Sequence, residues 1–227
     1  MPKQSALPRT DQRSGIRQEN EAQILKAAEA VFAEYGFKGA TTQMIAERAG
    51  IPKANLHYYF PTKLKLYRTV VDHIFQIWLR SANSFDESDD PVEALTRYIG
   101  EKMDISRAHP NGSKVWANEI LHKAPVIQDY LETTLREWTD GRVAVIRRWI
   151  DEGRIAPVDP HYLLYMIWAT TQHYADFGHQ IATLNGGAPL TDEQFEAAKR
   201  TVVEIILKGI GATPVPARKA RPTIRRL

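Results

Sequence analysis

From about Asn20 to Gly211, apolar residues recur at intervals of three and four, which is the spacing of one face of an α-helix. No run that alternates apolar and polar residues is longer than a few positions, so no β-strand is expected. The chain has 227 residues, 43% of them hydrophobic, which is enough for a substantial buried core. The sequence therefore predicts an all-α protein.

Caps and breakers set the expected ends of these helices. A first helix is expected over about 20–35, a short second one is capped by Thr41 or Thr42 and ends at Gly50, and Pro52 starts a third. Longer helices are then expected over about 63–84, 91–108, 112–122, 125–152, 160–177 and 192–209.

Charge is divided unevenly along the chain. Residues 1–69 hold 11 Lys and Arg against 6 Asp and Glu, a net charge of +5, whereas residues 70–211 hold 14 against 21, a net charge of −7. Residues 212–227 hold five basic residues and no acidic one. This pattern favours contact between the N-terminal part and a polyanion, with a different task for the acidic part.

Several classes of protein are disfavoured by composition. The chain has no cysteine, which excludes disulfides, thiolate catalysis and thiolate zinc sites. There is no apolar run near the roughly 18–20 residues that span a bilayer, and Met1 to Arg17 is polar and basic. We therefore expect a cytoplasmic protein without a cofactor.

The stretch "IPKANLHYYFPTK", residues 51–63, crowds polar and aromatic groups onto one short helix and its exit. Two short helices joined by a tight turn, behind a packing helix, have the lengths of a helix-turn-helix. Leu56 and Phe60 are four residues apart and are expected to face inward. The outer surface then carries groups that can contact phosphates and base edges: Lys53, Ala54, Asn55, His57, Tyr58 and Tyr59.

The longer stretch "GFKGATTQMIAERAGIPKANLHYYFPTKLKLY" resembles the DNA-binding signature of the TetR family. One departure is Pro52, where family members often have a serine that caps the recognition helix. The resemblance implies a sequence-specific transcriptional regulator, most often a repressor that binds a palindromic operator as a homodimer. The DNA-contact candidates that it implies are Thr42, Gln43, Lys53, Ala54, Asn55, His57, Tyr58, Tyr59 and Lys63.

The same resemblance divides the chain. We expect a flexible basic arm over 1–17, an N-terminal three-helix DNA-binding domain over 18–66, a helical ligand-binding and dimerisation domain over 67–211, and a disordered basic tail over 212–227. For the arm, which contains Arg9, Arg13 and Arg17, two readings remain open: contact with the DNA backbone or minor groove, and simple solvation.

A narrower resemblance lies in the C-terminal part. "ISRAHPNGSKVWANEILHKAP" and "HYLLYMIWATTQHYADFGHQI" are similar to the TetR-family branch that includes a regulator of pyrimidine utilisation. This likeness implies a small-molecule effector such as uracil or thymine. A non-pyrimidine effector remains the alternative.

The residues themselves suggest where an effector binds. Tyr162 to Phe177 begins apolar on every side but ends with polar residues, and buried polar groups need partners. Those partners are either a bound ligand or a second subunit. An aromatic platform with an amide and a carboxylate suits a planar heterocycle, and the ligand-binding candidates are Trp78, Trp116, Glu119, Trp168, Thr171 and Gln172.

Three further interpretations concern the same region. His173, Asp176 and His179 could belong to a metal or catalytic site, but no nucleophile elbow, phosphate loop or HExxH pattern is present, so an enzyme is not expected. A DNA-bound adaptor without a ligand would have a filled helical domain. By resemblance, helices over about 160–178 and 191–210 form the dimer interface through the stripe Phe195, Ala198, Val202, Ile205, Ile206 and Ile210.

Overall fold

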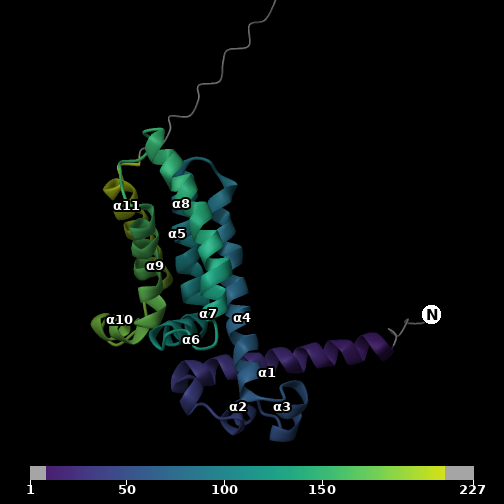
Figure 1. Ribbon diagram of the computed structural model, residues 1–227. Helices are drawn as coiled ribbons and strands as arrows, with labels where there is room; N and C mark the ends of the chain where they lie inside the picture. The colour runs from purple at the N-terminus through teal and green to yellow at the C-terminus, as the bar shows by residue number, and fades with distance from the viewer. Residues whose placement is uncertain (1–8, 213–227) are drawn as a thin grey trace, which may run out of the picture.

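The computed structural model describes residues 9–212, and every regular element within that range is a helix (Figure 1). Three helices form a small N-terminal unit: α1 (Arg9–Gly39), α2 (Thr42–Arg48) and α3 (Lys53–Tyr59). Helix α4 (Lys63–Ala82) leads from this unit into the larger helical body. The predicted all-α architecture is confirmed.

The larger body is built from the remaining elements, two of them one-turn segments labelled η. They are η1 (Asn83–Glu87), α5 (Pro91–Ala108), α6 (Pro110–Leu121), α7 (Gln128–Tyr130), η2 (Leu131–Leu135), α8 (Arg136–Asp151), α9 (Pro160–Asp176), α10 (Gly178–Leu184) and α11 (Asp192–Gly209). Helices α4, α5 and α8 run along the length of the body, and α9 and α11 cover one side of it (Figure 1). Helix α6 lies at the lower end, where it packs on α1.

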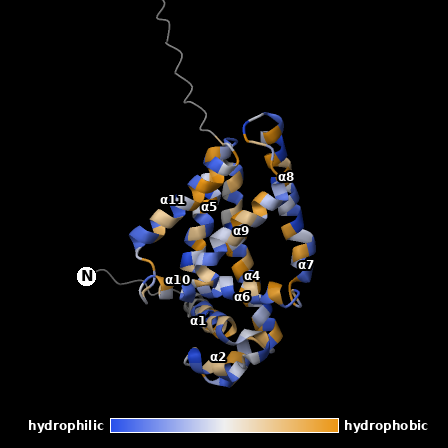
Figure 2. Cartoon of the chain, turned by 90° about the vertical axis from the view of Figure 1, so that its left-hand side faces the viewer, coloured by the Kyte–Doolittle hydropathy of each residue, from blue (hydrophilic) through white to orange (hydrophobic). Residues whose placement is uncertain are grey.

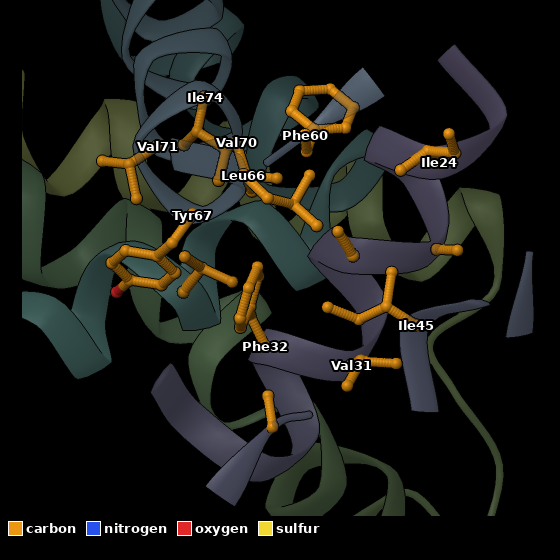
Figure 3. Packing of buried hydrophobic residues seen from close by; sticks show 14 of the residues in the cluster. Ile24, Val31, Phe32, Ile45, Phe60, Leu66, Tyr67, Val70, Val71 and Ile74 are labelled. Carbon is orange, nitrogen blue, oxygen red and sulfur yellow. The ribbon is translucent and has the colours of Figure 1, made fainter. Parts of the chain in front are cut away.

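Two hydrophobic cores hold these parts together. The first fills the N-terminal unit and continues through α4 to α6, so that Phe32 of α1 packs edge-on against Tyr67 of α4, with ring centroids 4.9 Å apart (Figure 3). The second lies among α5, α8, α9 and α11 around the fully buried Trp149. Because the first core includes Trp116 of α6, the N-terminal unit and the larger body share packed side chains.

The first helix differs from the prediction at its N-terminal end. It begins at Arg9 rather than near Asn20, so residues 9–17 of the predicted flexible arm are helical. At its other end Gly36 has a φ of +64°, a left-handed conformation that glycine adopts without strain, at the stop that the sequence predicted. Residues 1–8 of the predicted arm and residues 213–227 of the predicted tail lie outside the described residues.

The expected helix over 125–152 is also modified. Lys123 and Ala124 have φ values of +67° and +50°, so the chain reverses there and helical structure resumes only at Gln128. A π-helical turn, Leu131–Leu135, then precedes α8. Such turns are rare and leave no signal in apolar spacing, because they add a single residue to one turn. The short helix α10 was also absent from the sequence prediction.

Candidate functional site

Helix α3 presents the polar face that its sequence predicts. Leu56 is fully buried and Phe60 is 3% exposed, so both side chains anchor the helix in the first core, as expected. Tyr58 is 72% exposed and its ring meets that of Tyr59 edge-on. The other exposed residues of this face are Lys53, Ala54, Asn55 and His57. Within residues 9–212 the side chains of Lys53, Asn55 and His57 make no hydrogen bond, so their polar groups are available to an external partner.

The two short helices are held at a fixed angle by local bonds. Thr41, not Thr42, caps α2, because its hydroxyl oxygen accepts from the Met44 N–H at 3.2 Å. At the other end of α2, Gln23 of α1 donates to the Ala49 carbonyl at 2.7 Å. Gly50 makes the turn with a φ of +65°. Pro52 lies at the N-cap of α3, one residue before the position that its missing N–H suggested.

Three of the predicted DNA contacts already have partners inside the chain. The Lys63 ammonium donates to the carbonyls of Phe37 and Ala40, both at 2.8 Å, so it fastens α4 to the end of α1. The Tyr59 hydroxyl accepts from the Asn20 amide at 3.2 Å, and the Gln43 amide donates to the Glu47 carboxylate at 2.7 Å. Lys63 therefore stabilises the fold, and only one of the three N–H bonds of its ammonium remains to contact a DNA phosphate.

A second site lies inside the larger body, where α4, α5, α6, α8 and α9 meet around a cavity of about 80 Å³. Its lining residues are Phe75, Trp78, Leu79, Ala82, Tyr98, Lys102, Trp116, Leu135, Trp138, Trp168 and Gln172. Sites for drug-sized ligands are larger, roughly 300–1,000 Å³. The cavity therefore suits a compact ligand, and its aromatic walls suit a flat one.

The cavity includes four of the six predicted ligand-binding residues. Trp78 and Trp116 lie with ring centroids 5.3 Å apart, and Trp168 and Gln172 come from α9. The amide of Gln172 makes no hydrogen bond within the described part of the chain. It is the polar group in the cavity that can both donate to a ligand and accept from it.

The other two predicted residues serve the fold instead. Glu119 is 3% exposed, and its carboxylate accepts from the Tyr67 hydroxyl at 2.7 Å and from the Val126 N–H at 2.6 Å. Thr171 is fully buried, and its hydroxyl donates to the carbonyl of Ile167, one turn back in the same helix, at 2.8 Å. Neither residue lines the cavity, and contact of either with the effector stays a prediction.

Sequence reasoning missed several polar groups of the cavity. Lys102 of α5 is half-buried, with its ammonium 5.2 Å from the centroid of the Trp78 ring. Burial lowers the pKa of Lys102 to about 8, although nearby Asp176 partly opposes the change. The Tyr98 hydroxyl accepts from the Trp168 indole N–H at 2.8 Å, and burial raises the pKa of Tyr98. The Trp138 indole nitrogen is buried without a hydrogen-bond partner. A lysine within an apolar helical repeat gave no signal, because such residues most often extend into solvent.

Comparison with known proteins agrees with this geometry. Residues 24–70 match the family described as bacterial regulatory proteins, tetR family, and residues 71–213 match the family described as YcdC-like protein, C-terminal region. The chain belongs to the TetR family. It is 40% identical over 208 residues to the HTH-type transcriptional regulator RutR of Escherichia coli strain K12, a match that covers 91% of this chain and 98% of that protein.

Two further similar proteins show how far the likeness extends. The HTH-type transcriptional repressor NicS of Pseudomonas putida is 30% identical over 139 residues, which is 58% of this chain and 61% of NicS. The structure of the ketosteroid transcriptional regulator KstR2 of Mycobacterium tuberculosis superposes with a TM-score of 0.70 at 22% identity, over 84% of this chain and 94% of that one. The KstR2 likeness shows the shared fold alone.

Membership of the TetR family makes the chain an HTH-type transcriptional regulator rather than an enzyme. The alternative of a catalytic site at His173 and Asp176 is overturned, because the matched proteins are regulators. Within residues 9–212 no group of three His, Asp or Glu side chains is placed to hold a metal ion. Asp176 instead accepts from the Ser113 hydroxyl at 2.5 Å. Among the described helices none combines the length and apolarity that a membrane crossing requires.

The predicted dimer stripe on α11 needs correction. Most of its residues pack into the second core of their own subunit, where Val202 is only 6% exposed and Ile206 only 3%. Ile205 is the exception, because it lies at the edge of the stripe and is 66% exposed. Spacing alone identified the apolar stripe, but it could not show whether the stripe packs within its own subunit or against a second one.

Proposed function

We propose that this TetR-family regulator is a ligand-responsive repressor that binds a palindromic operator as a homodimer and holds a pyrimidine-like effector in the aromatic cavity. The observation that carries the proposal is the unpartnered Gln172 amide among four tryptophans. A site of this kind, coupled to a helix-turn-helix, has the parts of a chemical switch. A DNA-bound adaptor without a ligand would instead have a filled helical domain.

For DNA recognition, the exposed face of α3 supports insertion into a major groove. Asn55 and His57 offer amide and imidazole groups that can read base edges, while Lys53 and Tyr58 can reach phosphates. The predicted contacts Thr42 and Ala54 lie in the first turns of α2 and α3. Two such units related by a twofold axis would read two half-sites of a palindrome.

For dimerisation, apolar side chains on α9 and α11 support a subunit interface on the side of the body that Figure 2 turns toward the viewer. Tyr162, Tyr165 and Met166 are 70%, 50% and 46% exposed, and their spacing of three and four places them on one face of α9. Ile205 of α11 is exposed as well. Grouped large apolar side chains of this kind favour association with a second copy.

For the effector, the size and lining of the cavity favour one planar ring. The resemblance to the pyrimidine-utilisation branch supports uracil or thymine, whose carbonyl and N–H edges match the two functions of an amide. The ligand would act by binding one conformation of the dimer more tightly than the other, and only that difference in affinity can shift DNA binding.

Calorimetry with uracil and thymine tests the effector assignment directly. Gln172→Leu keeps a similar volume and deletes the amide, so we expect a loss of affinity of about 1–3 kcal/mol. Gln180→Leu, an exposed glutamine on α10 that does not line the cavity, is the matched control and should bind as the wild type does. If neither base binds the wild-type protein, the pyrimidine assignment fails while the repressor assignment stands.

A further inference from the structure

The polar groups of the cavity are strongly biased toward hydrogen-bond donors. Lys102 contributes an ammonium with three protons, and within the described residues it has neither a hydrogen bond nor a salt bridge. Trp138 also lines the cavity, and its indole N–H is buried without a partner. The Tyr98 hydroxyl accepts from the Trp168 indole N–H, and its proton remains for a ligand. Gln172 offers both a donor and an acceptor.

A ligand that satisfies these donors must bring several acceptors. A buried donor that stays unpaired after binding costs free energy, so a ligand with too few acceptors is selected against. Neutral uracil brings two N–H donors and only two carbonyl acceptors to a cavity whose own polar groups are mostly donors.

The charge of Lys102 favours an anion further. With a pKa of about 8, the lysine is mostly protonated at neutral pH. Its ammonium lies over the faces of Trp78 and Tyr98, at 5.2 Å and 5.9 Å from the ring centroids, so it is held between aromatic walls. A charge in such a poorly solvated place interacts strongly with an opposite charge.

The acidic residue nearest in effect to Lys102, Asp176, is only partly available to neutralise the lysine. Asp176 of α9 is the acidic group that acts on Lys102, but its carboxylate is already bonded to the Ser113 hydroxyl and is also influenced by Lys114 and His173. Lys102 and Asp176 are not close enough to form a salt bridge in the structure, so the ammonium retains its capacity for a ligand anion.

We propose that the cavity selects a planar heterocycle whose ring carries a negative charge spread over its carbonyl oxygens, and that Lys102 is the residue that selects it. This inference rests on the proposed function and narrows its effector class. The oxygens of the anion would accept hydrogen bonds from the Lys102 ammonium and the Tyr98 hydroxyl, while the Gln172 amide would pair with an N–H edge of the ring. No bond is made or broken, since the ring binds in the ionised form that exists in solution.

A matched pair of probes tests the proposal. Barbiturate has the ring of uracil with one more carbonyl oxygen, and it is an anion at neutral pH, whereas uracil is neutral. Calorimetry at pH 7 on the full chain should give at least about tenfold tighter binding of barbiturate than of uracil. Lys102→Met should reduce that ratio to near one, because methionine keeps the apolar stem and removes the charge. Lys114→Met, which removes a lysine near Asp176 that does not line the cavity, should keep the ratio.

The outcomes separate the two proposals. If uracil or thymine binds as tightly as barbiturate or more tightly, the anion proposal is overturned while the pyrimidine repressor stands. If none of the three binds, both the anion proposal and the pyrimidine assignment are overturned. If Lys102→Met does not fold, the ratio measured on the wild type still decides between an anionic and a neutral ring.

Discussion

The buried bond between Tyr67 and Glu119 joins the base of α4 to α6. The hydroxyl donates to the carboxylate at 2.7 Å, and the two residues are only 2% and 3% exposed. Tyr67→Phe leaves one carboxylate oxygen without this partner. Because hydrogen bonds to carboxylates contribute about 1.5–3 kcal/mol, we expect the free energy of unfolding to fall by that amount. In a chain of this size, this corresponds to a decrease in melting temperature of about 3–12 °C.

Tyr35→Phe is the matched control for this experiment. The Tyr35 hydroxyl is also influenced by a glutamate, Glu34, which raises the pKa of Tyr35, but Tyr35 is 47% exposed. Surface substitutions of this kind change stability by only about 0.5 kcal/mol or less. Both variants should be melted at one protein concentration, since the melting temperature of a dimer depends on concentration. Equal shifts for Tyr67→Phe and Tyr35→Phe would refute the reasoning, because burial would then make no difference to the bond.

The other predictions concern DNA, assembly and pH. Lys53→Ala should weaken binding to all DNA sequences and flatten the log-log salt dependence by about 0.9, as measured by anisotropy titrations at several salt concentrations. Asn55→Ala and His57→Ala should each alter the consensus selected from random DNA, and an unchanged consensus for both removes base reading from these residues. Ile205→Asp should give folded monomers with wild-type helicity that no longer bind the operator, which sedimentation and circular dichroism can check. Burial lowers the pKa of Lys102 from 10.5 to about 8, so the folded protein loses this proton first, and the free energy of unfolding should rise between those pH values; Lys102→Met should lack that rise in urea titrations.

The N-terminal unit could be predicted from sequence because its determinants are local. Thr41, Gly50 and Pro52 mark helix ends through backbone geometry and hydrogen bonds that involve near neighbours. Leu56 and Phe60 could be placed inward from their spacing alone, since a short helix on a small core has one apolar face. The structural role of Lys63 could not be predicted, because its carbonyl partners lie at the end of another helix.

The cavity could be predicted only in part, for a physical reason. Trp78, Trp116 and Trp168 were candidates because large aromatic rings suit a flat ligand, although such side chains more often belong to a core, as Trp116 also does here. Thr171 shows the difficulty, because a buried hydroxyl can bond to its own helix, and sequence does not distinguish that bond from one to a ligand. Lys102 was missed because its neighbours come from other helices, and only their packing turns an ordinary lysine into a buried charge.

Helix α6 connects the cavity to the DNA-binding unit through side chains one turn apart. Trp116 lines the cavity, and three residues later Glu119 binds Tyr67, whose ring packs against Phe32 and Phe37 of α1 at centroid distances of 4.9 Å. A ligand that displaces the backbone at Trp116 would move α6 as a unit, because intrahelical bonds resist bending. That movement would act on Tyr67 through a bond that cannot stretch without leaving a buried carboxylate unpaired. The response that costs the least free energy is for the N-terminal end of α4 and the C-terminal end of α1 to move together with α6. That movement would change the position of α3.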